Sequence, residues 1–287
     1  MSEVKTTGPA LYLVGTPIGN LEDITLRALR VLKEVDLIAC EDTRQTQKLL
    51  NHYAISTPTT SYHEHNEMTR SAELVKQMQE GASLALVTDA GMPGISDPGY
   101  RLISLAIRHH LPVVPVPGAS AFLAALVASG LPTDSFRFSG FLPAKRGERR
   151  TLLESAKNSP RTQAFYEAPH RIVEALEDVV EVLGPERHVV VAREVTKIHE
   201  EFLRGRASEV FAILKEREAV KGEITLLIGK AEEQHREMPA VWRQSVKQRV
   251  EQIVAEEKID EKAALKKVAK ERGVSKSEAY REMQREK

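Results

Sequence analysis

Short apolar runs alternate with longer amphipathic segments from residue 11 to about residue 230, and few folds are compatible with that alternation. Segments with apolar residues at three- and four-residue spacing separate the runs, which predicts helices between buried strands. The first group of predicted strands covers 11–15 (LYLVG), 36–40 (DLIAC), 83–88 (SLALVT) and 112–117 (PVVPVP). Strands that alternate with helices form largely parallel sheets. We therefore predict an α/β lobe over residues 1–130, closed by a helix that ends at Gly130.

A second alternation follows and predicts a second α/β lobe over residues 131–234, so the fold class is α/β with two lobes. Its predicted strands are 161–168 (RTQAFYEA), 188–197 (HVVVAREVTK) and 222–230 (GEITLLIGK). Helices are predicted at 169–184 and 207–220, and 131–140 (LPTDSFRFSG) is interpreted as a linker.

Residues 235–287 differ in character and predict a basic helical tail. Residues 262–276 carry six Lys or Arg side chains against Glu271 as the one acid. The pattern predicts a helix, a turn at Gly273 and a second helix, with Ser275 and Glu278 spaced as a capping box. This arrangement favours a helix-turn-helix-like unit, although a solvated helical tail is an equal alternative.

Composition excludes several classes of protein. Lys plus Arg and Asp plus Glu number 41 each, so any affinity for nucleic acid must come from local patches. A single cysteine, Cys40, leaves no pair for an internal disulfide or a cysteine-rich zinc site. No apolar stretch approaches the roughly 20 residues that span a bilayer, and the first ten residues lack the apolar centre of a signal peptide. We expect a cytoplasmic protein with no membrane partner.

Three glycine-containing loops follow predicted strands, at the ends where open α/β sheets bind their ligands. They are 14–20 (VGTPIGN), 89–94 (DAGMPG) and 117–120 (PGAS). None matches a dinucleotide or P-loop motif, so we expect a ligand held mainly by backbone groups. Any one loop alone is better explained as an ordinary tight turn, whereas three such loops together favour a binding site. Just beyond the second loop, Asp97 and Pro98 fit the cap and first residue of a helix.

Seven motifs occur in the order found in a known family: LYLVGTPIGNLEDIT, EDTR, DAGMPGISDPG, VPVPGASA, GFLPAK, FYEAPHRI and KGEITLLI. The chain resembles the type I methyltransferases of small-subunit ribosomal RNA, which belong to the tetrapyrrole-methylase fold class. The resemblance covers residues 10–230 and extends into the tail. It implies a cleft between the lobes that binds S-adenosyl-L-methionine. It also implies a homodimer that methylates the ribose 2′-hydroxyl of a cytidine in the decoding region of 16S rRNA, within the small ribosomal subunit. Met92 departs from the family pattern, which usually has threonine there.

The resemblance also implies which residues hold the cofactor. In the first lobe these are Pro17, Ile18, Gly19, Asp89, Gly91, Gly94, Ser120 and Ala121, and in the second Tyr166, Ala192, Gly222, Glu223 and Ile224.

A ribose hydroxyl is a poor nucleophile at neutral pH, so a base or an orienting group should assist it. Polar residues that follow predicted strands are the candidates: Glu41, Asp42, Arg44, His63 and Asn66, with His65 and Glu67 beside them. The EDTR segment alone is better explained as a helix start capped by Thr43, whose acids complement the helix dipole, but three polar groups directly after a buried strand keep a functional role open. Alternation places His63 and His65 on one face of a strand, where RNA or hydroxyl contact is favoured over metal binding. No third metal ligand is evident, and methyl transfer needs no metal.

Basic residues are the candidates for RNA phosphate contact. They are Lys145, Arg146, Arg149 and Arg150 in FLPAKRGERR, and Lys266, Lys267 and Lys270 in the tail. The first group is otherwise an exposed loop leading into a helix. In FYEAPHRI, Glu167 or His170 is expected to face the substrate, and Pro169 to start a helix. Two other functions stay open at this point: a small-molecule tetrapyrrole methyltransferase, and a non-catalytic RNA-binding assembly factor.

Overall fold

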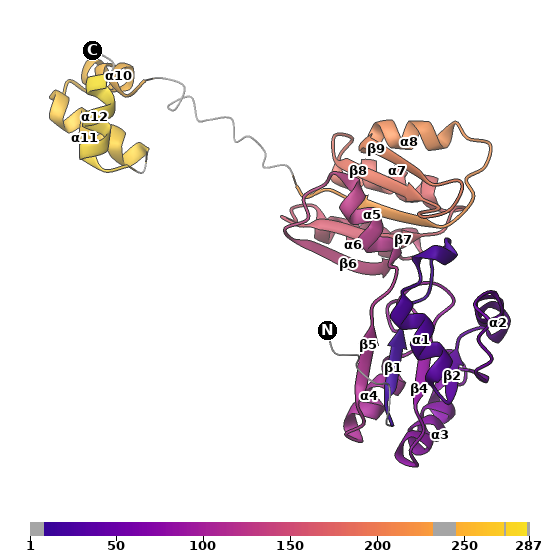
Figure 1. The fold of residues 1–287 in the computed structure, drawn as a ribbon. Helices are drawn as coiled ribbons and strands as arrows, with labels where there is room; N and C mark the ends of the chain where they lie inside the picture. Colours follow the sequence, from indigo (N-terminus) through magenta and orange to yellow (C-terminus); the bar gives the residue numbers. More distant parts are fainter. Residues whose placement is uncertain (1–8, 232–244, 273, 286–287) are drawn as a thin grey trace. The chain divides into compact units, whose positions relative to one another are not determined.

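A computed structural model describes residues 9–231, 245–272 and 274–285. The chain divides into two compact units, Met1–Ala231 and Glu232–Lys287. The first unit contains two five-stranded sheets, and the second is helical (Figure 1).

The first sheet is entirely parallel, as predicted, because each strand is followed by a helix that returns the chain to the same edge. Its strand order is β3 (Thr59–Ser61), β2 (Leu37–Cys40), β4 (Leu84–Val87), β1 (Leu11–Val14) and β5 (Val113–Val116). Helices α1 (Leu26–Glu34) and α2 (Thr43–His52) pack on one face, and α3 (Glu67–Gln79) and α4 (Tyr100–Arg108) on the other. The four predicted strands are confirmed, whereas β3 was not predicted.

The second sheet is mixed, which differs from the first. Its order is β6 (Phe136–Phe141), β7 (Thr162–Glu167), β10 (Ile224–Ile228), β8 (His188–Arg193) and β9 (Glu201–Arg206). Only β6 and β7 run parallel, and the other neighbours are antiparallel. The linker prediction for 131–140 is wrong, because β6 begins at Phe136. The predicted strands at β7, β8 and β10 are confirmed.

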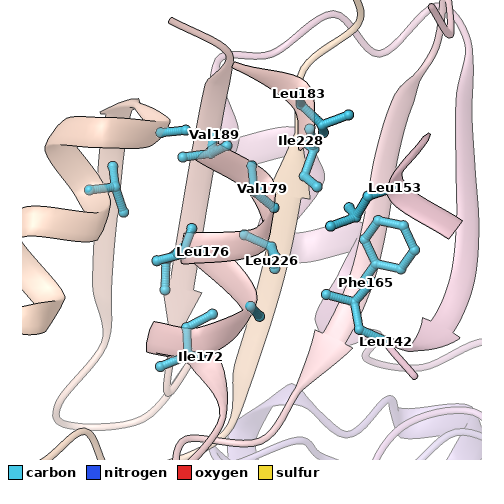
Figure 2. Packing of buried hydrophobic residues seen from close by; sticks show 14 of the residues in the cluster. Leu142, Leu153, Phe165, Ile172, Leu176, Val179, Leu183, Val189, Leu226 and Ile228 are labelled. Atoms are coloured by element: carbon cyan, nitrogen blue, oxygen red, sulfur yellow. The ribbon is translucent and has the colours of Figure 1, made fainter. Parts of the chain in front are cut away.

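Helices α6 (Arg146–Ala156), α7 (Ile172–Leu183) and α8 (Ala207–Lys215) share a core with one face of the second sheet. Figure 2 shows α7 in this core, where Ile172, Leu176 and Val179 belong to the same cluster as the strand residues Val189 and Leu226. Helix α5 (Ala121–Ser129) ends at Gly130 in the left-handed conformation, as predicted. It packs against β7, β8 and β10. The predicted lobe boundary at residue 130 therefore falls after a helix that belongs to the second lobe by its contacts.

The second unit has a core of its own, built from α10 (Val246–Glu257), α11 (Glu261–Glu271) and α12 (Lys276–Arg285). Buried Val250, Leu265 and Ala279 come from the three helices in turn. The predicted capping box is confirmed, since the Glu278 amide donates to Ser275 Oγ over 3.2 Å and the Ser275 amide to Glu278 Oε2 over 2.9 Å. Helix α10 was not predicted, and the turn residue Gly273 lies outside the described residues. None of the described helices is long and apolar enough to cross a membrane.

Candidate functional site

A cavity of about 360 Å³ lies between the two sheets of the first unit. Its walls come from the loops that follow strands β1, β4 and β5 of the first sheet, from the start of α5, and from strands β6, β7, β8 and β10 with their adjoining loops. The volume falls in the range of small-molecule sites, roughly 300–1,000 Å³. The structure thus brings together nine of the thirteen residues expected to hold a cofactor: Ile18, Gly91, Ser120, Ala121, Tyr166, Ala192, Gly222, Glu223 and Ile224.

Glycines allow the loops around the cavity to touch through their backbones. A Cβ atom on Gly15 would lie 2.7 Å from the Gly118 Cα, so the loops after β1 and β5 tolerate no side chain between them. Gly91 has φ +91°, and its backbone pairs with Thr16 through N···O distances of 2.9 and 3.1 Å. The side chain of Met92 lies over Gly15 and lines the cavity. The three loops, 14–20, 89–94 and 117–120, therefore contact one another through their backbones, and together they form an interlocked rim around the cavity.

The other four expected cofactor residues do not line the cavity. Asp89 accepts a hydrogen bond from the Asp42 amide over 3.1 Å. Gly94 lies under Gly99, whose Cβ would come within 3.1 Å of its backbone. Gly19 lies against the Lys197 side chain, and Pro17 is half-buried in the same loop. These four residues therefore belong to the loops around the cavity and contact neighbouring segments, but they do not face the cavity itself.

Asp97 lines the cavity, although the sequence suggested that it caps a helix. That prediction is wrong, because Gly99 is the N-cap residue of α4, with φ 152°, and the helix starts at Tyr100. Burial raises the pKa of Asp97 to about 6, and the charges of Glu41 and Asp89 add to the rise. The carboxylate is therefore costly to ionise until a cation approaches it.

Asp97, Glu167 and Glu223 are the acidic members of the described lining, which holds no Lys, Arg or His. The side chain of Glu167 is 0% exposed and that of Glu223 is 73% exposed, so Asp97 is the carboxylate that best fits a role inside the cavity. Glu167 is 2% exposed and accepts hydrogen bonds from the Ala168 amide (2.7 Å) and Arg171 (2.6 Å) through Oε1. Its Oε2 has no hydrogen-bond partner. Glu223 pairs with Lys197 Nζ at 3.3 Å.

The FYEAPHRI segment differs from its prediction. Glu167 belongs to the lining, but its side chain is 0% exposed and pairs with Arg171, so the expectation that it faces the substrate is wrong. His170 is exposed and lies outside the lining. Pro169 does not start the next helix, because Arg171 is the N-cap residue and α7 begins at Ile172.

The EDTR candidates lie beside the cavity and outside its lining. Glu41 accepts a hydrogen bond from the Thr88 hydroxyl over 3.0 Å. Asp42, and not Thr43, caps α2 through the Arg44 amide, and the Arg44 guanidinium contacts the same carboxylate at 2.7 Å. Those hydrogen bonds from Arg44 lower the pKa of Asp42 to about 2. Asp42 therefore fits a structural role better than that of a base.

His63 and His65 do not lie in a strand, so the prediction that they share a strand face is wrong. β3 ends at Ser61, and a turn over 64–66 leads into α3. Asn66 closes this turn: its Oδ1 accepts from the His63 amide over 2.9 Å. Neither histidine lines the cavity.

Three arginines expected to contact RNA converge on the buried carboxylate of Asp178, and Arg146 and Arg150 keep half-exposed side chains. Arg146 Nε and Arg149 Nε donate to it over 2.9 and 2.7 Å, and Arg150 contacts it at 3.3 Å. Arg149 is 1% exposed, so it is not available for phosphate contact. Lys145 is exposed beside Glu148.

The tail lysines lie on the surface of the second unit. Lys266, Lys267 and Lys270 are exposed on α11, and Lys267 pairs with Glu257.

Comparison with known proteins identifies the family. The sequence profile of the Tetrapyrrole (Corrin/Porphyrin) Methylases matches residues 10–210, which is more than half of the chain. The chain belongs to the tetrapyrrole methylase family. It is therefore an S-adenosyl-L-methionine-dependent methyltransferase, as the sequence predicted.

Relatives within this family span nearly the whole chain. "Ribosomal RNA small subunit methyltransferase I" of Halalkalibacterium halodurans is 52% identical over 94% of this chain and 93% of its own. The protein of the same name in Bacillus subtilis is 44% identical over 94% and 92%.

Solved structures confirm the tetrapyrrole-methylase fold. The methyltransferase CobJ is 21% identical, with a TM-score of 0.58 over 77% of this chain and 94% of its own. Diphthine synthase is 14% identical, with a TM-score of 0.56 over 77% and 90%.

The cavity fits the methyl donor of this family. The donor carries a positive sulfonium, which the half-buried carboxylate of Asp97 favours. Its amino-acid end is a zwitterion, which backbone amides and carbonyls of the loops can receive. A cofactor with phosphate groups would find no basic side chain among the same lining residues. Small or apolar residues such as Ala121, Ala192 and Ile224 can receive the flat adenine.

Proposed function

We propose that this tetrapyrrole methylase modifies 16S rRNA in the small ribosomal subunit, at the ribose 2′-hydroxyl of one cytidine in the decoding region. The observation that carries the proposal is the 52% identity, over 94% of the chain, to a protein named ribosomal RNA small subunit methyltransferase I. The nucleotide and the modified atom are expected from the sequence motifs, which extend through both walls of the cavity.

Within this proposal, the cavity residues bind and orient the donor. The donor supplies a methyl group activated by the positive charge on sulfur. Asp97 becomes fully ionised when that cation lies beside it, so part of the binding energy depends on this one carboxylate. Gly91, Ser120 and Gly222 line the same space, and the two glycines present only backbone groups to it. Alignment of donor and acceptor supplies much of the acceleration in such a transfer.

RNA contact is assigned to basic side chains that the fold leaves exposed. Lys266 and Lys270 lie one turn apart on α11, in a unit with its own core. Lys145 adds a cation at the start of α6. Contacts of this kind position an RNA without reading its sequence, and their strength falls as salt rises.

The proposal includes a homodimer in the cytoplasm. Leu123 and Val127 lie four residues apart on α5 and are 44% and 76% exposed, so they form an apolar strip on one face of that helix. Exposed apolar strips of this kind favour protein–protein contact. Light scattering on the wild type and on a Val127→Glu variant tests this, and a wild-type monomer at micromolar concentration would contradict it.

The deciding experiment is methyl transfer from radiolabelled S-adenosyl-L-methionine to small ribosomal subunits that lack ribose methylation, followed by nuclease mapping. We expect label on one decoding-region cytidine, as a 2′-O-methyl group. Free 16S rRNA is assayed beside the subunits to identify the better substrate. Donor binding without labelled RNA would favour a small-molecule methyltransferase, and absence of donor binding would favour a non-catalytic assembly factor.

A further inference from the structure

We infer that Phe141, together with Ile95, forms an apolar platform at the mouth of the cavity on which the base of the target nucleotide stacks. The inference rests on the proposed function and assigns a substrate-binding residue to the same site. Neither side chain was among the residues expected to hold the cofactor.

Exposure separates these two side chains from the rest of the apolar lining. Phe141 is 56% exposed and Ile95 is 39% exposed, although both line the cavity. The other aliphatic walls are buried: Ile18 is 6%, Val195 9% and Ile224 3% exposed. Phe141 and Ile95 therefore form the solvent side of the lining, where an acceptor would enter.

The backbone fixes Phe141 beside the loop that carries Ile95. Pairing between β6 and β7 shifts register between Phe138 and Phe141, and Gly140 in this irregular stretch has φ +65°. A Cβ atom on Gly140 would lie 3.3 Å from the Ser96 Oγ, so the end of β6 lies against residues 95–97. Phe141 therefore lines the cavity from the strand end that lies against the loop of Ile95 and Asp97, which line it as well.

Phe141 is the last ring in a row of aromatic side chains that contact one another. Its ring centroid lies 5.6 Å from that of Tyr166, at an interplanar angle of 60°. Tyr166 contacts Phe138 at 5.0 Å, and Phe138 stacks on Phe122 at 4.2 Å. Buried Leu142 follows Phe141 directly, and its amide donates to the Tyr166 carbonyl over 3.3 Å. Contact with Tyr166 on one side restricts the ring, so stacking on it loses less side-chain entropy than stacking on an unsupported side chain.

The chemistry of the mouth selects the base as the part of the nucleotide that it can hold. None of the described lining residues is Lys, Arg or His, so a phosphate finds no cation there. A nucleobase has an apolar face, and single-stranded or extruded bases commonly stack on aromatic side chains. Stacking on Phe141 would hold the nucleotide at the mouth while its ribose points toward the donor cavity.

The test compares Phe141→Ala and Phe141→Trp with Tyr100→Ala. Tyr100 is a matched control because it is 79% exposed but does not line the cavity. Steady-state methylation of small ribosomal subunits gives kcat and KM for each variant. Calorimetry gives the donor Kd, and thermal unfolding reports whether each variant is folded.

We expect Phe141→Ala to lower kcat/KM for subunits about 5- to 150-fold, the range of measured base–aromatic stacking effects. Its donor Kd should stay within about twofold of wild type. Phe141→Trp should recover most of the activity, and Tyr100→Ala should resemble wild type. Unchanged kcat/KM in Phe141→Ala, or a donor Kd that weakens in proportion, would overturn the inference. Failure of the proposed function is recognised separately, since the wild type itself would then leave subunits unlabelled.

Discussion

Replacing Asp178 by alanine should destabilise the first unit strongly, because this buried carboxylate neutralises a buried cation. Asp178 is 0% exposed and Arg149 is 1% exposed, and they are joined at 2.7 Å. Removing one partner of a buried ion pair costs about 3–5 kcal/mol. Arg146 and Arg150 are half-exposed, so each can return to solvent and adds about 1 kcal/mol or less. Glu174 lies 3.8 Å from Arg149 but is 70% exposed, so it compensates poorly.

For a domain of this size, each kcal/mol changes the melting temperature by about 2–4 °C, so Asp178→Ala should lower Tm by about 10 °C. Circular dichroism during heating measures this. Lys145→Ala is the matched control: its exposed pair with Glu148 should contribute less than about 1 kcal/mol. The double variant Arg149→Met, Asp178→Leu should recover most of the loss, because a well-packed apolar pair can replace a buried ion pair. A Tm for Asp178→Ala within about 2 °C of the control, the change expected for less than 1 kcal/mol, would refute the reasoning.

Three further predictions concern the donor, the rim and the tail. Asp97→Asn should weaken donor binding roughly tenfold, which corresponds to the free energy of one pKa unit. In the wild type, donor affinity should fall as the pH drops through about 6, because Asp97 then becomes protonated. Calorimetry at pH 5 and pH 8 checks both, and equal affinities would contradict them. Gly118→Ala should destabilise the first unit by about 1–3 kcal/mol, since its Cβ would lie 2.7 Å from the Gly15 Cα; an unchanged melting temperature argues against the interlocked rim. A chain ending at Ala231 should keep wild-type donor affinity but bind small subunits more weakly, with a shallower salt dependence in filter binding; undiminished binding would remove the tail from RNA recognition.

The strands that the sequence failed to predict lie at the edges of the two sheets. β3 and β9 are outermost, as is β6, which was taken for a linker. β9 (EFLRGR) has no residue that is fully buried, and β6 is exposed at both ends. An edge strand can face water, so its sequence needs no continuous apolar run. The central strands are buried on both faces, and their apolar runs predicted them correctly.

Side chains at the site were harder to assign than the loops that carry them. Loop positions follow from strand ends, and nine of the expected residues do line one cavity. Asp97 was misassigned because an Asp-Pro pair before a helix is also a good cap, and only the backbone at Gly99 shows that the helix starts later. Arg149 was misassigned because its partner, Asp178, lies 29 residues away on α7. Local sequence carries no signal for a contact at that separation.

β10 is the last strand of the second sheet in sequence, yet it lies at its centre between β7 and β8. During synthesis, the strand pairs β6–β7 and β8–β9 are therefore complete before β10 exists. The inner edges of β7 and β8 stay unpaired until residues 224–228 have been synthesised. Residues 222–225 also complete the wall of the cavity. An unfinished chain consequently has two edges open to chaperones or to aggregation, and lacks part of the wall against which a ligand would bind. Capture of the methyl donor should begin only when the last strand has been inserted.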